Sequence, residues 1–436
     1  MLNWLFLGLI LVATVTGALA GTMGEVSAQS IKMAKTAVDI SISLIGQMAL
    51  WLGVFQILQD AGMMGAIARA LKPVMSRLFP DIPEDHPALG AMIMNIAANM
   101  MGLTNAATPF GIKAMIELNK LNDRPGVATN AMCLFLTINT SGVAVLPTGA
   151  IAVRAAMGAD NATGIFFPTI LATMCSTVVG IVVAKTLQSL GFFAADKYGD
   201  VEAGEVKDPA DIKGLGDAEK LASETTASHP VRLILAMLVV GVLAFGLGSE
   251  VNRQVATESV LDVIKVLSAD WILPILLVAI LLVGFVKKIR VYESVVRGAK
   301  QGFEVGVMVI PFLVAILVAI GMFRGSGAME WIVSGLTPIL GPLGFPPEAL
   351  PMAIIRPLSG SGALGVVTET MKTTGPNSFA SFVVSTMSGS TETTFYVLAV
   401  YFGAIGVRAS RYTVLSCLAA DLTGITAAVA LSHVFF

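Results

Sequence analysis

The chain carries a series of near-continuous apolar stretches, each about as long as a helix must be to cross a bilayer. Such a helix needs roughly 20 apolar residues at about 1.5 Å per residue. Because 55% of the residues are hydrophobic and only 13% are charged, we predict an all-α polytopic membrane protein. The uninterrupted stretches are 3–20, 40–58, 163–190, 231–248, 270–286, 304–323 and 410–436.

Two further stretches are long enough to cross but are interrupted by polar residues. Two shorter segments, 88–120 and 347–374, are expected to be re-entrant helical hairpins, since irregular backbone at membrane depth must be buried in protein or line a wet cavity. The prediction is therefore about nine transmembrane spans plus two hairpins, with broken helices at the midplane. The interrupted stretches are 127–157, broken at Asn139–Gly142, and 379–407, broken at Ser388–Glu392.

Positive charges predict the orientation of the spans. Counted from the amino terminus, one side of the membrane receives most of the Lys and Arg residues, including Lys287, Lys288 and Arg290. By the positive-inside rule this side is the cytoplasm. The first stretch lacks the positive charge that precedes a signal peptide, so we expect it to be retained. A bacterial inner-membrane location follows, with the N-terminus and the polar segment 191–230 cytoplasmic and the C-terminus outside.

The two halves of the chain resemble one another. Gly62 and Pro73 have counterparts in Gly327 and Pro338 at the same separation. Each half predicts a span, an amphipathic segment, a hairpin, a broken span and a final span. Five crossings separate the two copies, so they face opposite ways, and inverted repeats with broken helices are typical of secondary transporters. The predicted units are a first repeat at 1–190 with its N-terminal span, an acidic linker at 191–230, and a second repeat at 231–436 with two leading spans.

Amide and hydroxyl side chains interrupt the apolar pattern of the first repeat. Asn95 and Asn99 are four residues apart, so they project from one face of a helix, and Asn105 and Thr108 follow in the same hairpin. Buried amides must find hydrogen-bond partners. The partners of these amides are either the freed backbone of the hairpin or a polar ligand. Asn139, in the broken span, is a further candidate solute-binding residue.

In the second repeat, the position of Asn95 is taken by Arg356. A guanidinium in the hydrocarbon layer is costly unless it is paired, so Arg356 should face the protein interior. Its partner is either Glu392, in the following break, or an anionic solute. Ser359 and Ser361 lie in the same polar stretch, and we include all four residues among the candidates for solute binding.

The stretch Gly360–Gly365 matches the letters of a dinucleotide-binding motif, but that motif requires a preceding strand. Here the preceding segment is a proline-containing membrane run, so nucleotide binding of this kind is not expected. His86, His229 and His433 are not placed to assist a nucleophile or to share a metal. We therefore predict neither an enzyme nor a metal site.

Oxygen-bearing side chains at the two breaks predict a site for a coupling ion. Such ligands suit Na⁺ or H⁺ better than a transition metal. A second intramembrane acid, Asp421 in the last span, either carries a proton or caps a small-residue contact between helices. The candidate ion ligands are Thr140, Ser141, Ser390, Thr391 and Asp421.

Several long motifs carry a resemblance to a known family. FPDIPEDHPALGAMIMNIAANMMGLTNAATPFGIKAM and NAMCLFLTINTS resemble spore maturation protein A, across roughly residues 1–190. IRPLSGSGALG and GSTETTFYVLAVYFGAIG resemble spore maturation protein B, across roughly residues 268–436. Proteins of this kind carry the nucleoside-recognition, or Gate, domain. The resemblance implies a transport role with two Gate repeats and identifies no substrate.

The leading hypothesis is an inner-membrane secondary transporter of a small polar or anionic solute, coupled to an ion. The solute would be nucleoside-like, amino-acid-like or phosphate-bearing, and its site would lie at the midplane between the repeats. The alternatives are a non-transporting scaffold or assembly factor for the envelope or spore, and a passive channel. The expected partners are the solute and membrane lipids, with homo-oligomerisation left open. A net charge of -2 gives no reason to expect nucleic acid.

Overall fold

Helices make up most of the part of the chain that the structure describes. The computed structural model describes residues 2–83, 85–101, 104–142, 147–198, 201, 203–208, 212, 230–255, 263, 266–267, 270–308 and 310–436. In these ranges no strand forms, and a single β-bridge joins Val127 to Ala409. The all-α prediction is confirmed, whereas most of the predicted linker 191–230 lies outside the described residues. No strand precedes Gly360–Gly365 in these ranges, and residues 360–374 are helical.

The first half contains a helix that is longer than predicted. The expected span 40–58 is part of α2, a single helix of 38 residues, about 57 Å at 1.5 Å per residue. No proline interrupts it, and it stops before Gly62, whose φ of 69° is left-handed. The helices of this half are α1 (Leu2–Ala20), α2 (Met23–Asp60), α3 (Met63–Leu78), α4 (Pro87–Met100), α5 (Thr104–Lys120), α6 (Asn130–Ser141), α7 (Thr148–Ala156) and α8 (Phe166–Ser189), with short 3₁₀ turns η1 (Thr163–Ile165), η2 (Gly191–Phe193) and η3 (Ala195–Tyr198).

The second half repeats the order of elements seen from α2 to α8. Gly327, like Gly62, has a positive φ directly before its amphipathic helix, and Pro338, like Pro73, lies inside that helix. The predicted span 304–323 falls on two helices, α13 and α14. The helices of this half are α10 (Pro230–Val255), α12 (Ile272–Val286), α13 (Val291–Met308), α14 (Ile310–Gly325), α15 (Ala328–Leu340), α16 (Leu350–Ile355), α17 (Gly360–Thr374), α18 (Phe379–Ser390), α19 (Thr394–Ala404) and α20 (Thr413–Phe435), with 3₁₀ turns η5 (Gly341–Leu343) and η6 (Pro347–Ala349).

Among the described residues, four helices are long and apolar enough to cross a membrane on their own: α2, α8 from residue 163, α10 and α20. The pair α14 and α15, bent by 72°, would add a fifth if it forms one span. The nine spans predicted from the sequence also include the shorter apolar helices α1 and α12 and the two broken spans. Each half of a broken span is too short to cross alone, because none exceeds 12 residues.

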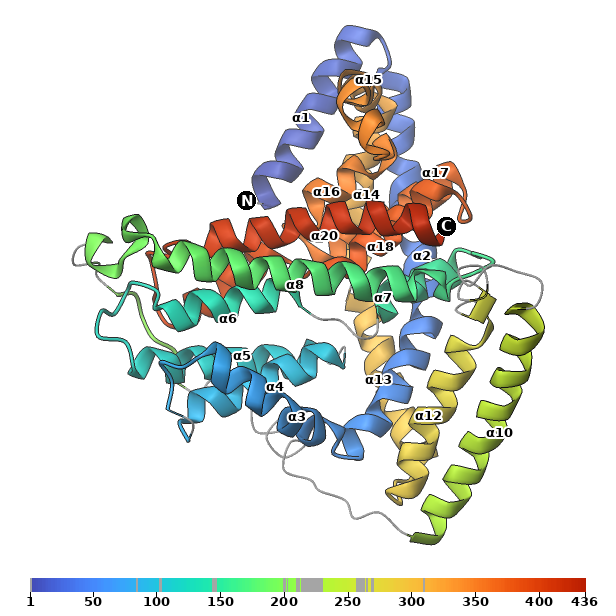
Figure 1. Cartoon of the computed structure of the whole chain (residues 1–436). Helices are drawn as coiled ribbons and strands as arrows, with labels where there is room; N and C mark the ends of the chain where they lie inside the picture. The colour runs from blue at the N-terminus through green and yellow to red at the C-terminus, as the bar shows by residue number, and fades with distance from the viewer. Residues whose placement is uncertain are drawn as a thin grey trace.

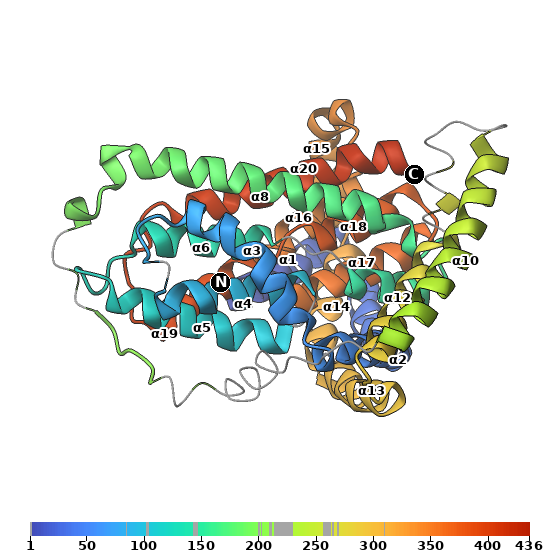
Figure 2. The same ribbon diagram turned by 60° about the horizontal axis from the view of Figure 1, so that its bottom comes forward.

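The helices form two sets that run across one another. In Figure 1, α8 and α20 lie side by side, and α6 is near them, while the long helix α2 runs steeply past them beside α13. The pair α10 and α12 lies at one edge in both views (Figures 1 and 2). Figure 2 also shows α4 and α5 side by side, on the side of α6 away from α8. Both helix breaks lie inside this arrangement, within a few residues of their predicted positions.

The two broken spans run in opposite directions. Backbone N–H groups of Arg408 and Ala409, which follow α19, donate to the carbonyl oxygen of Gly126, which precedes α6. At the other end, the side chain of Asn377 before α18 donates to Asp160 after α7, with 2.6 Å between N and O. The start of each broken span therefore lies beside the end of the other, and the two breaks meet between these ends.

Candidate functional site

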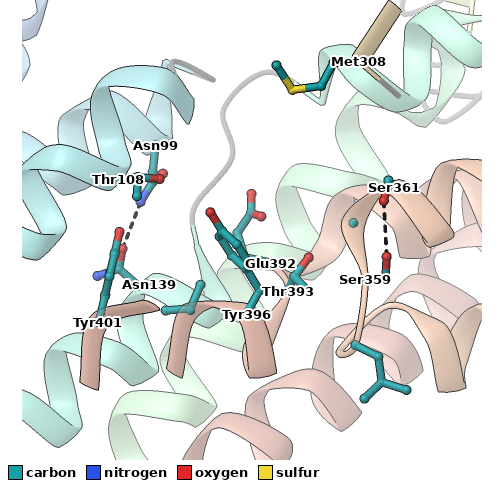
Figure 3. A pocket seen from close by; sticks show the side chains of 13 residues that line it. Asn99, Thr108, Asn139, Met308, Ser359, Ser361, Glu392, Thr393, Tyr396 and Tyr401 are labelled. Atoms are coloured by element: carbon teal, nitrogen blue, oxygen red, sulfur yellow. Dashed lines mark hydrogen bonds between the residues drawn. The ribbon is translucent and has the colours of Figure 1, made fainter. Parts of the chain in front are cut away.

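A cavity of about 520 Å³ lies where the breaks meet the two helical hairpins (Figure 3). One wall comes from α4, α5 and the end of α6. The opposite wall comes from the start of α17 and from the break before α19. Met308, Leu358 and Val397 give the cavity an apolar component. Its polar lining consists of Asn99, Thr108, Asn139, Ser359, Ser361, Glu392, Thr393, Tyr396 and Tyr401.

Two amides form the first wall. Asn99 Nδ2 donates to Asn139 Oδ1 at 3.0 Å, and Asn139 Nδ2 donates to the carbonyl oxygen of Phe135 at 3.0 Å (Figure 3). These two hydrogen bonds fix the orientation of both amides at the cavity surface. The structure thus brings together two residues that the sequence placed in different elements. Thr108 lines the same wall.

Asn95 has a different place from Asn99, although both were predicted on one helix face. Asn95 is fully buried and does not line the cavity. Its Nδ2 donates to the carbonyl oxygen of Ala107 at 2.7 Å and to the Tyr401 hydroxyl at 3.1 Å. The geometry therefore favours the alternative in which Asn95 ties the hairpin together. The side chain of Asn105 lies outside the described residues.

Tyr401 was missed by the sequence analysis. Its ring stacks on Phe135 with 6.3 Å between centroids and 8° between planes, and its hydroxyl reaches Asn95. Space for the ring exists because residue 111 is glycine: a Cβ there would overlap the Tyr401 hydroxyl and ring. A glycine inside α5 was the only sequence signal, and it did not reveal which side chain would fill the space.

The second wall is built on the start of α17. Ser359 caps this helix by accepting from the Gly362 N–H at 3.0 Å, and Ser359 and Ser361 hydroxyls are 3.3 Å apart (Figure 3). The first N–H groups of a helix carry a partial positive charge. The predicted residues Ser359 and Ser361 therefore line the part of the cavity next to the start of α17, where a negatively charged or hydrogen-bond-accepting group of a ligand would be favoured.

Arg356 lies behind this wall and not on the cavity surface. Only 6% of the residue is exposed. Its guanidinium donates to the carbonyl oxygen of Thr391 and to the Thr393 hydroxyl, the latter at 3.2 Å. The ion pair with Glu392 Oε2 is longer, at 3.7 Å, and the Glu392 side chain is 48% exposed. Glu392 is thus only weakly held by Arg356, and its carboxylate faces the cavity.

The predicted ion ligands fall into two separate groups. In the first break, the hydroxyls of Thr140 and Ser141 donate to carbonyl oxygens of their own helix. Their carbonyl oxygens accept from other elements: that of Thr140 from the Glu392 N–H and that of Ser141 from the Thr173 hydroxyl. These two side chains are satisfied locally and do not line the cavity.

Ser390, Thr391 and Asp421 form the second group, on the far side of the break from the cavity. The Ser390 hydroxyl donates to the carbonyl oxygen of Met387 at 2.9 Å. Asp421 Oδ2 accepts from the Thr394 hydroxyl at 2.7 Å. Within the described residues, no group of three or more His, Cys, Asp or Glu side chains could hold a metal.

Comparisons with known proteins agree with this two-part construction. A family model described as Gate, nucleoside recognition, matches residues 41–157 and 307–408. Spore maturation protein B of Bacillus subtilis (strain 168) is 44% identical over 176 residues, which cover 40% of this chain and 98% of that protein. Spore maturation protein A of the same organism is 40% identical over 185 residues, 42% of this chain and 94% of that protein.

No solved structure matches the chain significantly. The family model covers the hairpins, the breaks and the cavity walls in both halves of the molecule. Two relatives, each matched over nearly its whole length, together account for most of the chain. The chain therefore belongs to the nucleoside-recognition (Gate) family of membrane proteins and joins in one polypeptide regions similar to spore maturation proteins A and B.

Proposed function

We propose that the protein is an inner-membrane secondary transporter that binds a small polar or anionic solute in the cavity between its halves. The observation that carries this proposal is that both cavity walls come from corresponding elements. Each half contributes a helical hairpin and a helix break. A scaffold protein has no need of a polar cavity at this position, whereas a transporter places its substrate there.

Inverted repeats are part of the proposal. The two broken spans lie antiparallel, and each half has the same order of elements. This is the geometry expected when one repeat is turned over relative to the other. In such transporters the two repeats move against one another and expose the central site to each side in turn. The distribution of positive residues supports an orientation with the N-terminus in the cytoplasm and the C-terminus outside.

The lining limits the chemistry of the solute. A volume of about 520 Å³ lies within the usual range of small-molecule sites. Asn99, Asn139 and the serines at the start of α17 can donate hydrogen bonds to acceptor oxygens. Glu392 can accept from hydroxyl or ammonium groups of the solute. Tyr396 and Tyr401 add aromatic surface, so nucleoside-like, amino-acid-like and phosphate-bearing solutes all remain candidates.

Thermal unfolding of purified protein tests this proposal, since a ligand that binds only the native state raises apparent stability. The panel contains nucleosides, nucleotides, amino acids and lipid-linked phosphates. We expect one class to raise the Tm, and Asn99→Ala, Ser361→Ala and Glu392→Gln to reduce that shift. Glu330→Gln, at an exposed position on α15, is the matched control and should leave the shift intact.

A positive result is followed in proteoliposomes. Accumulation of the solute against its gradient, driven by an ion gradient, supports secondary transport. Flux that never exceeds equilibration would favour the passive channel. If no compound binds while one protein co-purifies stoichiometrically, the scaffold hypothesis is correct and the transport proposal fails.

A further inference from the structure

Residues 391–394, which we call the strap, separate Arg356 from Asp421. The strap consists of the non-helical residues 391–393, which link α18 to α19, and of Thr394, the first residue of α19. Thr391 has extended backbone angles (φ −144°, ψ 173°). In extended backbone, successive groups point to opposite sides. The Thr391 carbonyl and the Thr393 hydroxyl accept from Arg356, on the cavity side. The Thr394 hydroxyl donates to Asp421 on the other side.

Two buried oxygens beside the strap have no hydrogen-bond partner among the described residues. They are Asp421 Oδ1 and Thr391 Oγ1, and each residue is only 2% exposed. The Thr391 side chain lies beside the Asp421 carboxylate. The two side chains are close enough to interact, but no hydrogen bond of normal geometry joins them, and both oxygens are removed from solvent. A carboxylate oxygen left in this state is costly unless something else binds it.

The helix opposite approaches the strap closely at this place. Gly424 lies about one turn after Asp421 on α20, and a Cβ there would be 2.5 Å from Thr391 Cγ2. The same Cβ would be 3.3 Å from both the carbonyl and the hydroxyl oxygen of Ser390. The absence of a side chain at Gly424 therefore lets α20, which carries Asp421, pack directly against Ser390 and Thr391.

The charged side chains around Asp421 do not balance one another. Arg356 is the positive charge that acts on Asp421, and it is shared with Glu392, its ion-pair partner. Around Asp421, α8 contributes the Ser176 hydroxyl, which bonds to the Ala420 carbonyl, and Cys417 lies one turn earlier on α20. Two carboxylates thus face one guanidinium, and a single monovalent cation would balance them.

We propose that Asp421, the Thr391 hydroxyl and the Ser390 carbonyl bind a Na⁺ ion, and that the strap links this ion to the solute site. Hard oxygen ligands suit an alkali cation. An ion bound by the Thr391 hydroxyl would hold the strap, whose Thr391 carbonyl in turn holds Arg356. The link to solute binding rests on the proposed transport function, whereas the ion site itself does not. Thr140 and Ser141 are not part of this site.

The ion site is tested without any solute, by thermal unfolding in NaCl against choline chloride at constant ionic strength. We expect the Tm to rise with Na⁺ concentration. Asp421→Asn and Thr391→Val should weaken the apparent Na⁺ affinity by more than about tenfold. Thr391→Ser, which keeps the hydroxyl, should retain the response. Thr426→Val, on the exposed face of α20, is the matched control and should also retain it.

The outcomes separate the two proposals. A Tm that does not respond to Na⁺, or a full response in Asp421→Asn, overturns the ion site. A Tm that follows pH through Asp421 but ignores Na⁺ overturns it in favour of a proton at the same carboxylate. A Na⁺ response together with no binding of any solute supports the ion site and contradicts the proposed transport function. If both ligands bind, Na⁺ should tighten solute binding in the wild type and not in Thr391→Val.

Discussion

The backbone N–H of Glu392 donates a hydrogen bond to the carbonyl oxygen of Thr140, with 2.7 Å between N and O. Each residue lies at the helix break of its own half. Unwinding a helix frees backbone groups that must find new partners, and here one freed group from each half satisfies the other. A shift of either break therefore acts directly on the other half and on the cavity beside it.

Asn95 and Asn99 should have separable roles. Asn95→Ala removes the bonds to the Ala107 carbonyl and the Tyr401 hydroxyl inside the protein, so we expect a loss of about 1–3 kcal/mol in stability. Asn99→Ala, at the cavity wall, should change stability less and weaken solute binding more. Unfolding and ligand titration of both variants measure this, and equal effects on both quantities would contradict the assignment.

Arg356→Gln should destabilise the protein. The substitution removes the guanidinium that donates to the buried carbonyl oxygen of Thr391, and an unsatisfied buried acceptor costs about 1–3 kcal/mol of stability. The strap also loses its contact with residue 356. Thermal unfolding measures the loss. Arg253→Gln removes another ion-paired arginine, but one whose side chain is 75% exposed, and should leave the Tm unchanged. Wild-type stability in Arg356→Gln would show that its contacts do not hold the strap.

The packing of α13 on α2 should depend on Gly298 and Gly302, which lie one helical turn apart. A Cβ at Gly298 would overlap the carbonyl of Leu52, and one at Gly302 would be 2.5 Å from the Ala49 backbone. Small residues at this spacing allow close helix approach in membranes. Gly298→Leu should therefore lower the Tm and the yield of folded protein. Gly241→Leu on α10, where nothing lies within 4 Å, should not.

Gly111→Ala should disturb the cavity through Tyr401. The added Cβ would meet the Tyr401 ring, and such overpacking costs about 1–3 kcal/mol. Gly90→Ala in α4 has open space around the new Cβ and should be neutral or stabilising, because alanine favours helices by about 1 kcal/mol over glycine. Unfolding of the pair gives the comparison. Gly111→Ala combined with Tyr401→Phe should remain destabilised, because the ring carbon that carries the hydroxyl would still lie 2.3 Å from the new Cβ.

Local patterns in the sequence predicted the helices and their breaks well. A run of apolar residues and an interruption by Asn, Ser or Thr are both visible within some twenty positions, and α6, α18 and α19 end or begin near the predicted places. The length of α2 was not predicted, since its first part is polar enough to resemble a loop while containing no residue that stops a helix.

The candidate site was predicted only in part. Asn99, Asn139, Ser359, Ser361 and Glu392 do line one cavity. The five predicted ion ligands do not form one group. The hydroxyls of Thr140, Ser141 and Ser390 bond to carbonyl oxygens of their own helices. Thr391, in contrast, lies beside Asp421 of α20. Equivalent positions in the two halves thus acquired different partners, which a comparison of the halves alone does not reveal.

The sequence was enough to predict a helical chain with helices apolar enough to cross a membrane, and to predict where two of the helices break. These properties follow from hydrophobic run length and local backbone chemistry. Three contacts could be found only in the folded molecule: the Glu392 N–H bonds to the Thr140 carbonyl, Asn95 bonds to the Tyr401 hydroxyl, and the strap bonds to both Asp421 and Arg356. Such contacts join distant residues, and their partners are fixed by how whole helices pack and which buried polar atoms are left to be satisfied.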